Sequence, residues 1–358
     1  MVSDPARVDD VVSGLLRESV DAREFDIVCS EYETCIVPAA VLAEAFGLAG
    51  IPITTAVALR DKMVQKNLVR SAGIPVAECR TVVSATDLAI ADGDSPFVVK
   101  PLAGSCSQLT YSVRDGESLE RAKSAIASSG QHGPWLVEEF MAGDELHFDG
   151  VVRHGEVRFL GISRYLQNVI DIRNGGLVGS VTVDPTTSAS LYEQALELTT
   201  GSLEALGHTD GVFHLEVFEH EGRLAFSECA GRIGGGMVYE TTQAKFGVDL
   251  YDEWARAVLG LPSAISAGRS DTSPYGWVQL IAHPGRVTSM PDSDDLRAYR
   301  GVVAVQGNLR VGDTVPDVSA ASHLRAARVV MRGEDENGLA DDMRGLAAWF
   351  SDQVKVAS

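Results

Sequence analysis

The sequence is short of basic residues. Its 30 Lys and Arg residues stand against 50 Asp and Glu residues, which gives a formal net charge of −20. This charge argues against a general binder of nucleic acids or of anionic membranes, because both polyanions would be repelled. A small anionic ligand held in a locally basic cleft is still compatible with it.

Cysteines are also few, and long apolar runs are missing. The five cysteines are odd in number and lack the spacing of metal ligands, so we expect free thiols in a reducing cytoplasm. The N-terminus has no basic segment followed by an apolar run, and no stretch approaches the ~18 apolar residues of a membrane span. With 45% hydrophobic and 22% charged residues, the composition is typical of a globular enzyme, and we expect a cytoplasmic one.

The length of 358 residues predicts two or three domains. The first of them has an incomplete α/β pattern. Residues 8–16 have helical spacing, residues 25–30 resemble a short buried strand, and residues 36–46 form an apolar helix that ends at Gly47. A complete nucleotide-binding domain would open with a strand and a glycine-rich turn, and neither precedes Val8. We therefore expect a shortened first domain, or a chain that begins late.

Two acidic residues mark neighbouring β-type runs in the middle of the chain. Residues 213–218 and 224–230 are separated by a polar turn with a glycine, which predicts an antiparallel hairpin. Glu216 and Glu228 lie among apolar neighbours, where carboxylates are rare unless they are paired or bind a cation. Mg²⁺ bound to phosphate oxygens would resolve their repulsion, since it accepts one or two carboxylates. The alternative is an ordinary hairpin with both side chains in solvent.

Groups suited to binding anions lie on both sides of this hairpin in the sequence. Arg232 follows it, and then come Gly234, Gly235 and Gly236, whose backbone N–H groups can approach an anion closely. Upstream, a predicted strand at residues 96–101 delivers Lys100 to a Gly/Ser loop. A lysine with backbone and hydroxyl donors suits a triphosphate, although an edge strand that ends in an exposed lysine would give the same pattern.

Two further segments complete the pattern. Residues 60–75 predict an amphipathic helix with Lys62 near its start, and such a lysine is usually a solvated surface residue. Residues 135–150 predict a strand, a polar hinge and a second strand. A hinge of this kind can offer backbone groups to an adenine edge while an acidic side chain binds the ribose hydroxyls.

In this order, the segments resemble the ATP-grasp superfamily, and within it the carboxylate–amine ligases related to the L-amino-acid ligases (dipeptide synthetases). The resemblance covers roughly residues 26–320. It implies an ATP-grasp fold of the α+β / α/β class, with ATP between two α+β subdomains. The implied domains are a shortened N-terminal α/β domain (1–59), an ATP-grasp domain (60–262, with a lid subdomain at about 75–134) and a β-rich α+β C-terminal domain (263–358).

The resemblance also implies roles for single residues. Lys62 and Lys100 match the phosphate-binding lysines, Glu216 and Glu228 match the metal carboxylates, and Arg232 matches the arginine that steadies an acyl phosphate. The remaining matches are Gly104, Ser105 and Ser107 in the lid loop, Glu138, Glu139 and Met141 at the adenine hinge, Glu145 at the ribose, and Gly235 in the catalytic glycine loop.

Some positions depart from the family pattern or leave alternatives open. Ala230 stands where many relatives have an Asn, so a second Mg²⁺ would be held weakly or through water. In the lid loop, Cys106 and Gln108 replace a frequent glycine or arginine. We favour His214 as a satisfied, partly buried histidine over a substrate contact. Two arginines, Arg164 and Arg173, are either carboxylate-binding or surface residues.

The implied reaction is ATP-dependent formation of an amide or peptide bond. A carboxylate is converted to an acyl phosphate, an amine attacks it, and ADP and phosphate are released. We expect ATP and Mg²⁺ (or Mn²⁺) as cofactors, small amino-acid-like substrates, a homodimer, and neither a nucleic acid nor a membrane as partner. Two alternatives are a carboxylase that uses bicarbonate and a non-catalytic ATP-binding protein.

Overall fold

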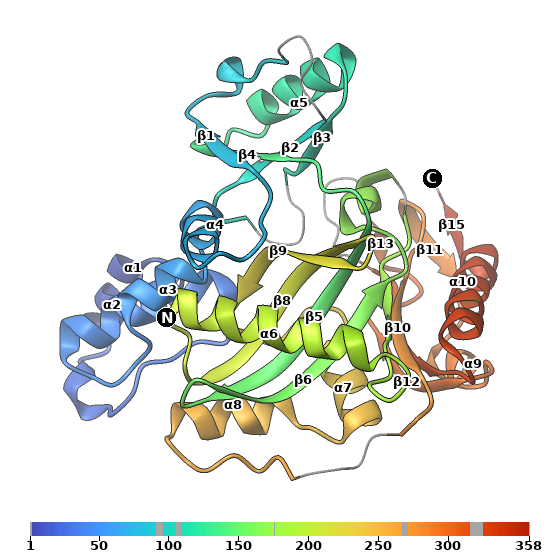
Figure 1. Ribbon diagram of the computed structural model, residues 1–358. Coiled ribbons are helices and arrows are strands. Elements are labelled where there is room, and N and C mark those ends of the chain that lie inside the picture. The colour runs from blue at the N-terminus through green and yellow to red at the C-terminus, as the bar shows by residue number, and fades with distance from the viewer. Residues whose placement is uncertain are drawn as a thin grey trace.

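The computed structural model describes residues 2–90, 96–104, 109–174, 176–266, 271–315 and 325–357, with the backbone alone at residues 172–174. A small four-stranded sheet stands above a broad eight-stranded sheet (Figure 1). The N-terminal helices lie on one side of the large sheet, and the C-terminal helix lies on the other. None of the described helices is long and apolar enough to cross a membrane.

The N-terminal segment is mainly helical. Its elements are α1 (Val8–Arg17), η1 (Ala22–Glu24), η2 (Glu33–Cys35), α2 (Ile36–Phe46), α3 (Ile53–Ala58) and α4 (Lys62–Ser71). Helix α2 has the predicted bounds and ends at Gly47, which has a φ of 69°. The strand predicted at residues 25–30 is wrong: Ile27 makes a single bridge with Ala49, and Phe25 is 52% exposed. The reason is that no strand in the described part of the chain lies alongside to pair with its backbone groups.

The small sheet has the strand order β1-β4-β2-β3 and is antiparallel throughout. Its elements are β1 (Cys79–Val82), η3 (Ala85–Asp87), β2 (Phe97–Pro101), β3 (Tyr111–Val113), α5 (Gly116–Ser128) and β4 (Trp135–Glu139). Helix α5 packs its apolar residues Leu119, Ala122 and Ile126 into a core with the strands. The predicted strand that carries Lys100 is β2, and the first strand of the predicted hinge is β4.

The large sheet has the order β12-β14-β10-β7-β6-β5-β8-β9, again antiparallel. Its strands are β5 (Asp144–Arg153), β6 (Glu156–Tyr165), β7 (Gly179–Thr182), β8 (Gly211–His220), β9 (Arg223–Ala230), β10 (Tyr275–Leu280), β12 (Val302–Gly307) and β14 (Ala327–Arg332). The predicted hairpin is β8–β9, and its turn has positive φ at Glu221 (51°) and Gly222 (73°). The large sheet contains strands from both sides of residue 262, where one domain boundary was predicted. The domain boundaries therefore stay a prediction.

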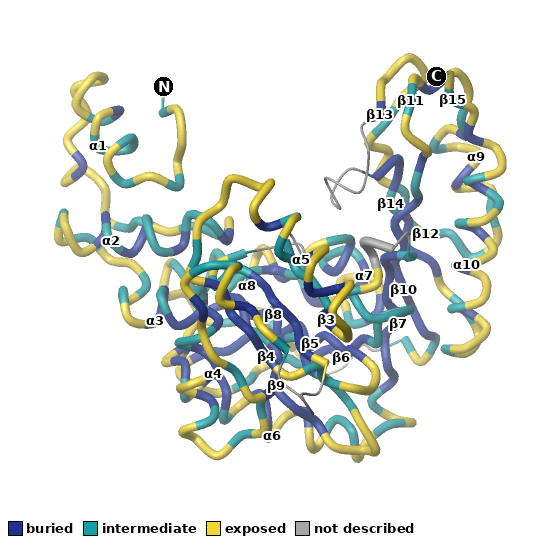
Figure 2. Tube along the Cα trace, turned by 90° about the horizontal axis from the view of Figure 1, so that it is seen from above, coloured by how far each residue is buried: buried dark blue, intermediate teal, exposed yellow. Residues whose placement is uncertain are grey.

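Helices cover both faces of the large sheet. The remaining elements are η4 (Val169–Asn174), α6 (Ala189–Leu206), α7 (Val238–Phe246), α8 (Leu250–Val258), α9 (Ser293–Arg297), α10 (Glu336–Gln353), and a three-stranded sheet of β13 (Thr314–Val315), β11 (Gly285–Ser289) and β15 (Lys355–Ala357). Helix α6 packs on one face of β5, β6, β8 and β9, whereas α7 and α8 lie on the other. Figure 2 shows the strands largely buried and the outer faces of the helices exposed.

Candidate active site

Polar residues alternate with apolar ones along the two central strands β5 and β8. On β5, Leu146 and Phe148 belong to the core beneath α6, so Glu145, His147 and Asp149 face the opposite side of the sheet. Strand β8 alternates in the same way and adds His214 and Glu216 to this face. Pairing places His147 opposite Glu216 and Asp149 opposite His214. The local alternation thus gathers a row of ionisable groups on one face of the sheet.

The two predicted metal carboxylates lie directly opposite each other on β8 and β9. Next to this pair the register shifts, so that Ser227 is an extra residue on β9, a β-bulge of the kind found beside active sites. Lys62 Nζ lies 2.8 Å from Glu228 Oε1, and His214 Nε2 lies 3.7 Å from Glu216 Oε1. Burial would raise the pKa of Glu216, but the neighbouring His214 and nearby lysines lower it to about 2.

Helix α4 is fixed to the outer edge of the large sheet. The Gln65 side chain donates to Cys229 O (2.6 Å) and accepts from Cys229 N (3.0 Å), and Lys66 Nζ donates to Ser227 O (2.9 Å). These bonds replace a neighbouring strand for β9, which is the edge strand. They also hold Lys62, at the start of the helix, over Glu228, where its Nζ donates to Gly104 O as well (2.9 Å).

Lys100 on β2 and Glu138 on β4 form an ion pair. Lys100 Nζ lies 2.6 Å from Glu138 Oε1, and the buried Lys66 Nζ lies 3.0 Å from Oε2. Burial would raise the pKa of Glu138, but the two lysines lower it to about 2. Both carboxylate oxygens of Glu138 are thus paired with lysines. Sequence analysis missed Lys66, although its place four residues after Lys62 puts both on one helical face.

Glu145 has no cationic partner in the described structure. Its Oε2 accepts a hydrogen bond from Val169 N (2.6 Å), and its own backbone N–H donates to Asn168 Oδ1 (3.1 Å). Burial, followed by repulsion from Glu216, raises the pKa of Glu145 to about 8. The carboxyl group is therefore mostly protonated at neutral pH.

Arg232 is held by an acidic residue from the N-terminal segment. Its Nε lies 2.7 Å from Glu33 Oε2, and Arg60 Nη1 lies 2.8 Å from Glu33 Oε1. Glu31 Oε1 accepts a hydrogen bond from Ile233 N (3.1 Å), and burial raises the pKa of Glu31. Sequence analysis missed Glu31, Glu33 and Arg60, because nothing local links them to an arginine 199 residues away from Glu33.

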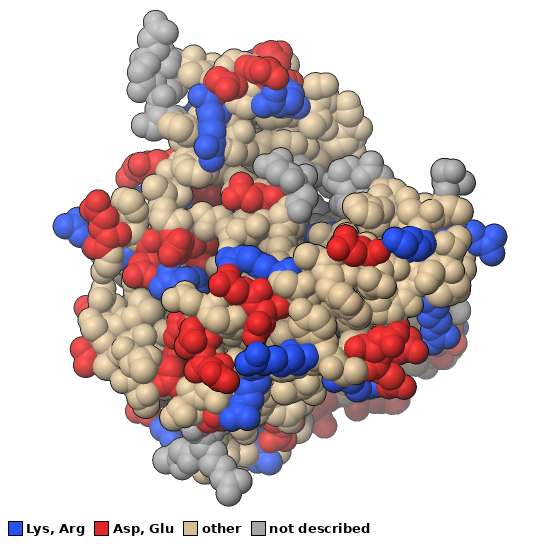
Figure 3. Space-filling view, turned by 90° about the vertical axis from the view of Figure 1, so that its right-hand side faces the viewer, with Lys and Arg blue, Asp and Glu red and all other residues tan. Residues whose placement is uncertain are grey.

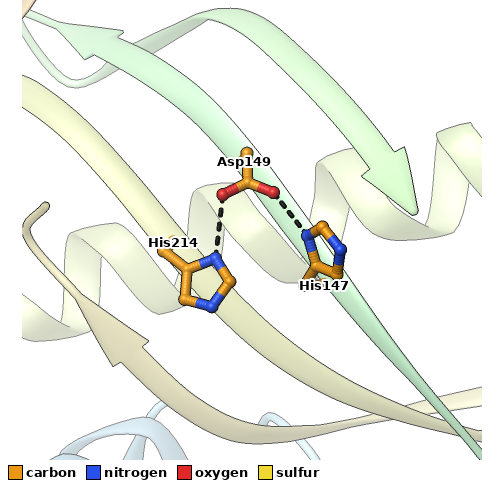
Figure 4. A group of neighbouring side chains, drawn as sticks. All are labelled: His147, Asp149 and His214. Atoms are coloured by element: carbon orange, nitrogen blue, oxygen red, sulfur yellow. Dashed lines mark hydrogen bonds and ion pairs between the residues drawn. The ribbon is translucent and has the colours of Figure 1, made fainter. Parts of the chain in front are cut away.

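A buried hydrogen-bonded group on β5 and β8 lies next to Glu216, which pairs with His147 across the two strands (Figure 4). Asp149 accepts from His214 Nδ1 (2.8 Å) and from His147 Nδ1 (2.5 Å), and His147 Nε2 lies 2.7 Å from Ser180 Oγ. Burial would lower the pKa of His214, but Asp149 raises it to about 9. The two histidines and Asp149 offer ligand atoms within 4.8 Å of one another, which is close enough for a metal ion. His214 is buried and bonded to Asp149 through Nδ1, as expected of a satisfied histidine, but it also lines the cleft described next, so the choice between this role and a substrate contact stays a prediction.

One cleft with a volume of about 550 Å³ brings the predicted residues together. All predicted site residues that the structure describes line it, namely Lys62, Lys100, Gly104, Glu138, Glu139, Met141, Glu145, Glu216, Glu228, Arg232 and Gly235. Ser105 and Ser107 lie outside the described residues, as does the Arg173 side chain. Arg164 does not line this cleft and forms ion pairs with Asp144 (2.8 Å) and Glu219 (2.7 Å). The individual roles of these residues remain predictions.

Comparisons with known proteins agree with this geometry. A family model of the ATP-grasp domain matches residues 94–240. The chain is 27% identical to an L-arginine-specific L-amino acid ligase of Bacillus subtilis over 342 residues, which are 91% of this chain and 80% of that protein. It is 25% identical to dapdiamide A synthase of Enterobacter agglomerans over 231 residues, 61% of this chain and 53% of that protein.

Solved structures show the same fold. An L-amino acid ligase from Bacillus licheniformis superposes with a TM-score of 0.77 at 20% identity, covering 99% of this chain and 86% of that one. A carboxyaminoimidazole ribonucleotide synthase from Aspergillus clavatus gives a TM-score of 0.74 at 17% identity, covering 97% and 86%. Residues 94–240 match the ATP-grasp domain, the structure has the ATP-grasp fold, and the chain resembles the L-amino-acid ligases.

Proposed function

We propose that the chain is an ATP-dependent ligase that joins a small carboxylic or amino acid to an amine through an acyl phosphate. The observation that carries this proposal is the opposed pair Glu216 and Glu228 in one cleft with Lys62, Lys100 and Arg232. Carboxylates for a divalent ion, lysines for phosphates and an arginine for the transferred group are the parts that phosphoryl transfer needs. Similarity to an amino acid ligase over 91% of the chain supports an amine as the acceptor.

The donor set fits Mg²⁺, with Mn²⁺ as an alternative. Hard divalent cations prefer carboxylate oxygens, and here two half-buried glutamates face each other, near a third, Glu145, whose pKa is raised by burial and then by repulsion from Glu216. We propose that Glu216 and Glu228 bind the ion, which would neutralise phosphate charge when bound. Ala230 has no oxygen ligand to add, so we propose one firmly held ion.

The chain's own residues would perform the remaining steps. Lys62 and Lys100 bind the phosphates, with Lys100 held in place by Glu138. The hinge backbone around Glu138, Glu139 and Met141 binds adenine, and Glu145 binds the ribose. The substrate carboxylate takes the γ-phosphoryl group from ATP. Arg232 and the N–H groups of the glycine loop (residues 234–236) then stabilise the acyl phosphate until an amine attacks its carbonyl carbon and phosphate leaves.

The first test is phosphate release from Mg·ATP with amino acids supplied singly and in pairs, with mass spectrometry of each positive reaction. A ligase requires two substrates and gives a product mass equal to their sum less water. We expect Lys100→Ala, Glu228→Ala and Arg232→Ala each to lower turnover at least ~100-fold, because each removes charge stabilisation of the transition state. Lys123→Ala, on the surface of α5, is the control. Near-normal turnover in all three variants would refute the site.

The same assay separates the other candidates. Phosphate release with bicarbonate alone would indicate a carboxylase, and ATP binding without release under all conditions would indicate a non-catalytic protein. The likeness to carboxyaminoimidazole ribonucleotide synthases is a likeness of fold, since the identity is 17%. A homodimer and a cytoplasmic location stay predictions, and light scattering of the purified protein tests the first.

A further inference from the structure

The end of the cleft formed by β10 and β14 carries polar groups with no assigned role. Gln279 on β10 is paired with Arg328 on β14, and Trp277 lies two residues before Gln279. These three side chains share one face of the sheet, because directly paired residues point the same way and alternate residues do too. Their neighbours Val278 and Val329 point to the other face, into the core formed with α10. Accordingly, Trp277, Gln279 and Arg328 all line the cleft.

The glycine loop connects this end to the metal carboxylates. A Cβ on Gly234 would lie 2.7 Å from both Asp149 Oδ1 and His214 Nδ1, so Gly234 packs directly on the group beside Glu216. Gly236 packs against the six-membered ring of Trp277. The loop proposed to hold the acyl phosphate therefore spans from the catalytic carboxylates to Trp277. A ligand beyond Trp277 would extend away from the reacting carbonyl.

Arg328 differs from the other cations in the cleft. Lys62 pairs with Glu228, Lys100 with Glu138, and Arg232 with Glu33. Within the described chain, Arg328 forms no ion pair, and its one side-chain hydrogen bond runs from Nη1 to Gln306 Oε1 (3.3 Å). This guanidinium is therefore free to bind an anion.

Two buried donors at this end have no acceptor among the described residues. They are Arg328 Nε and the indole Nε1 of Trp277, a residue that is only 3% exposed. A buried donor without a partner is energetically costly, and most buried donors in proteins are hydrogen-bonded, so these two point to an acceptor supplied by a ligand. An arginine and an indole N–H are donors only, and the partner must supply acceptor oxygens.

We infer that Trp277 and Arg328 bind a free carboxylate of an amino-acid-like substrate, a carboxylate that the reaction does not activate. This inference rests on the proposed ligase function and adds a substrate requirement to it. A guanidinium binds a carboxylate through paired, charge-assisted hydrogen bonds. The carboxylate belongs either to the amine acceptor or to the side chain of the activated acid. In both cases the enzyme discriminates against a substrate in which this group is an amide.

The test uses the substrate pair found by mass spectrometry and compares each carboxylate that is not activated with its carboxamide, namely the carboxylate of the amine acceptor and a side-chain carboxylate of the activated acid. For the wild type, we expect one of the carboxamides to lower kcat/KM at least ~10-fold, and that carboxamide identifies the source of the carboxylate. Arg328→Gln should raise KM for the same free acid at least ~10-fold, leave KM for ATP within about twofold, and largely abolish the preference for the acid. Trp277→Phe keeps an aromatic ring but removes the indole N–H, and it should show a smaller effect in the same direction.

Arg332→Gln is the matched control. Arg332 lies on the same strand, but it pairs with Asp271 (3.1 Å) and does not line the cleft. An unchanged preference for the acid in Arg328→Gln, with only a lower melting temperature, would overturn the inference and leave the ligase intact.

A wild type without ligase activity would refute the proposed function instead. The carboxylate site would then be judged by thermal shift with free amino acids and with their amides. Stabilisation by the acids alone that is lost in Arg328→Gln supports the site, and equal responses to both refute it.

Discussion

Glu145 shows how one buried side chain makes the stability of this fold depend on pH. Burial and the neighbouring Glu216 raise its pKa to about 8, whereas a glutamate in an unfolded chain has a pKa of about 4.3. Between these values, the folded chain keeps a proton that the unfolded chain has lost. The folded state binds more protons in this window, so the contribution of Glu145 to stability falls as the pH rises from about 4.5 to about 8.

Glu145→Gln should remove this contribution, because an amide does not titrate. We expect the free energy of unfolding of the wild type to fall relative to the variant by about 1 kcal/mol per pH unit between about pH 5 and pH 8, without nucleotide. Urea denaturation at several pH values measures it. Glu156→Gln, which changes an exposed glutamate, is the control. Parallel pH profiles for the wild type and Glu145→Gln would contradict the buried, protonated state.

At the scale of the elements, the glycine loop after β9 depends on close packing more than on flexibility. Gly234 rests on the hydrogen bond between Asp149 and His214, where a Cβ would lie 2.7 Å from both partners. Real Cβ atoms do not approach other atoms so closely, so an alanine must displace either the loop or the hydrogen-bonded side chains of Asp149 and His214. Gly235, in contrast, has no atom within 4 Å of its added Cβ.

We expect Gly234→Ala to lower kcat at least ~10-fold while KM for ATP changes little, since the displaced N–H groups face the acyl phosphate rather than the nucleotide base. The free energy of unfolding should fall by about 1–3 kcal/mol, as for other overpacked sites. Gly235→Ala should cost less stability, because its methyl group has room. Steady-state kinetics and chemical denaturation measure both effects. Wild-type values for Gly234→Ala would show that the loop does not need this packing.

On the scale of the whole molecule, three parts of the chain meet at the cleft. The small sheet brings Lys100, the large sheet brings Glu216 and Glu228, and the N-terminal segment brings Glu33. The chain carries a formal net charge of −20, and Figure 3 shows basic side chains interspersed with acidic ones on the face drawn. Binding of an anionic nucleotide therefore depends on the cations inside the cleft and on the metal ion.

Removing the metal tests this dependence. At about 100 times its dissociation constant, Mg·ADP should raise the free energy of unfolding by about 2.7 kcal/mol. With EDTA, the same ADP concentration should give much less, because the phosphates would then face Glu216 and Glu228 without a cation between them. Glu228→Gln should reduce the difference between the two conditions. Equal stabilisation by ADP with and without Mg²⁺ would argue against the metal site.

Much of this architecture follows from local sequence patterns. The hairpin of β8 and β9 was predictable because a polar turn with Gly222 separates two apolar runs, and α2 was predictable from its apolar spacing and Gly47. Lys62, Lys100 and Glu228 could also be chosen as site residues from the sequence, because each lies near the end of a predicted strand or helix. Residues 25–30 failed as a strand because an apolar run does not reveal whether another strand lies alongside.

The sequence by itself determined the resemblance to ATP-grasp enzymes and the main charged groups of the cleft, because these groups sit at fixed places in regular elements. Only the tertiary structure decided which groups meet. It paired Glu33 with Arg232 across 199 residues, and among the described residues it left Arg328 without a carboxylate partner. Alternation along a strand assigns a side chain to a face of the sheet. Whether that face becomes a core or a cleft depends on which distant segment covers it.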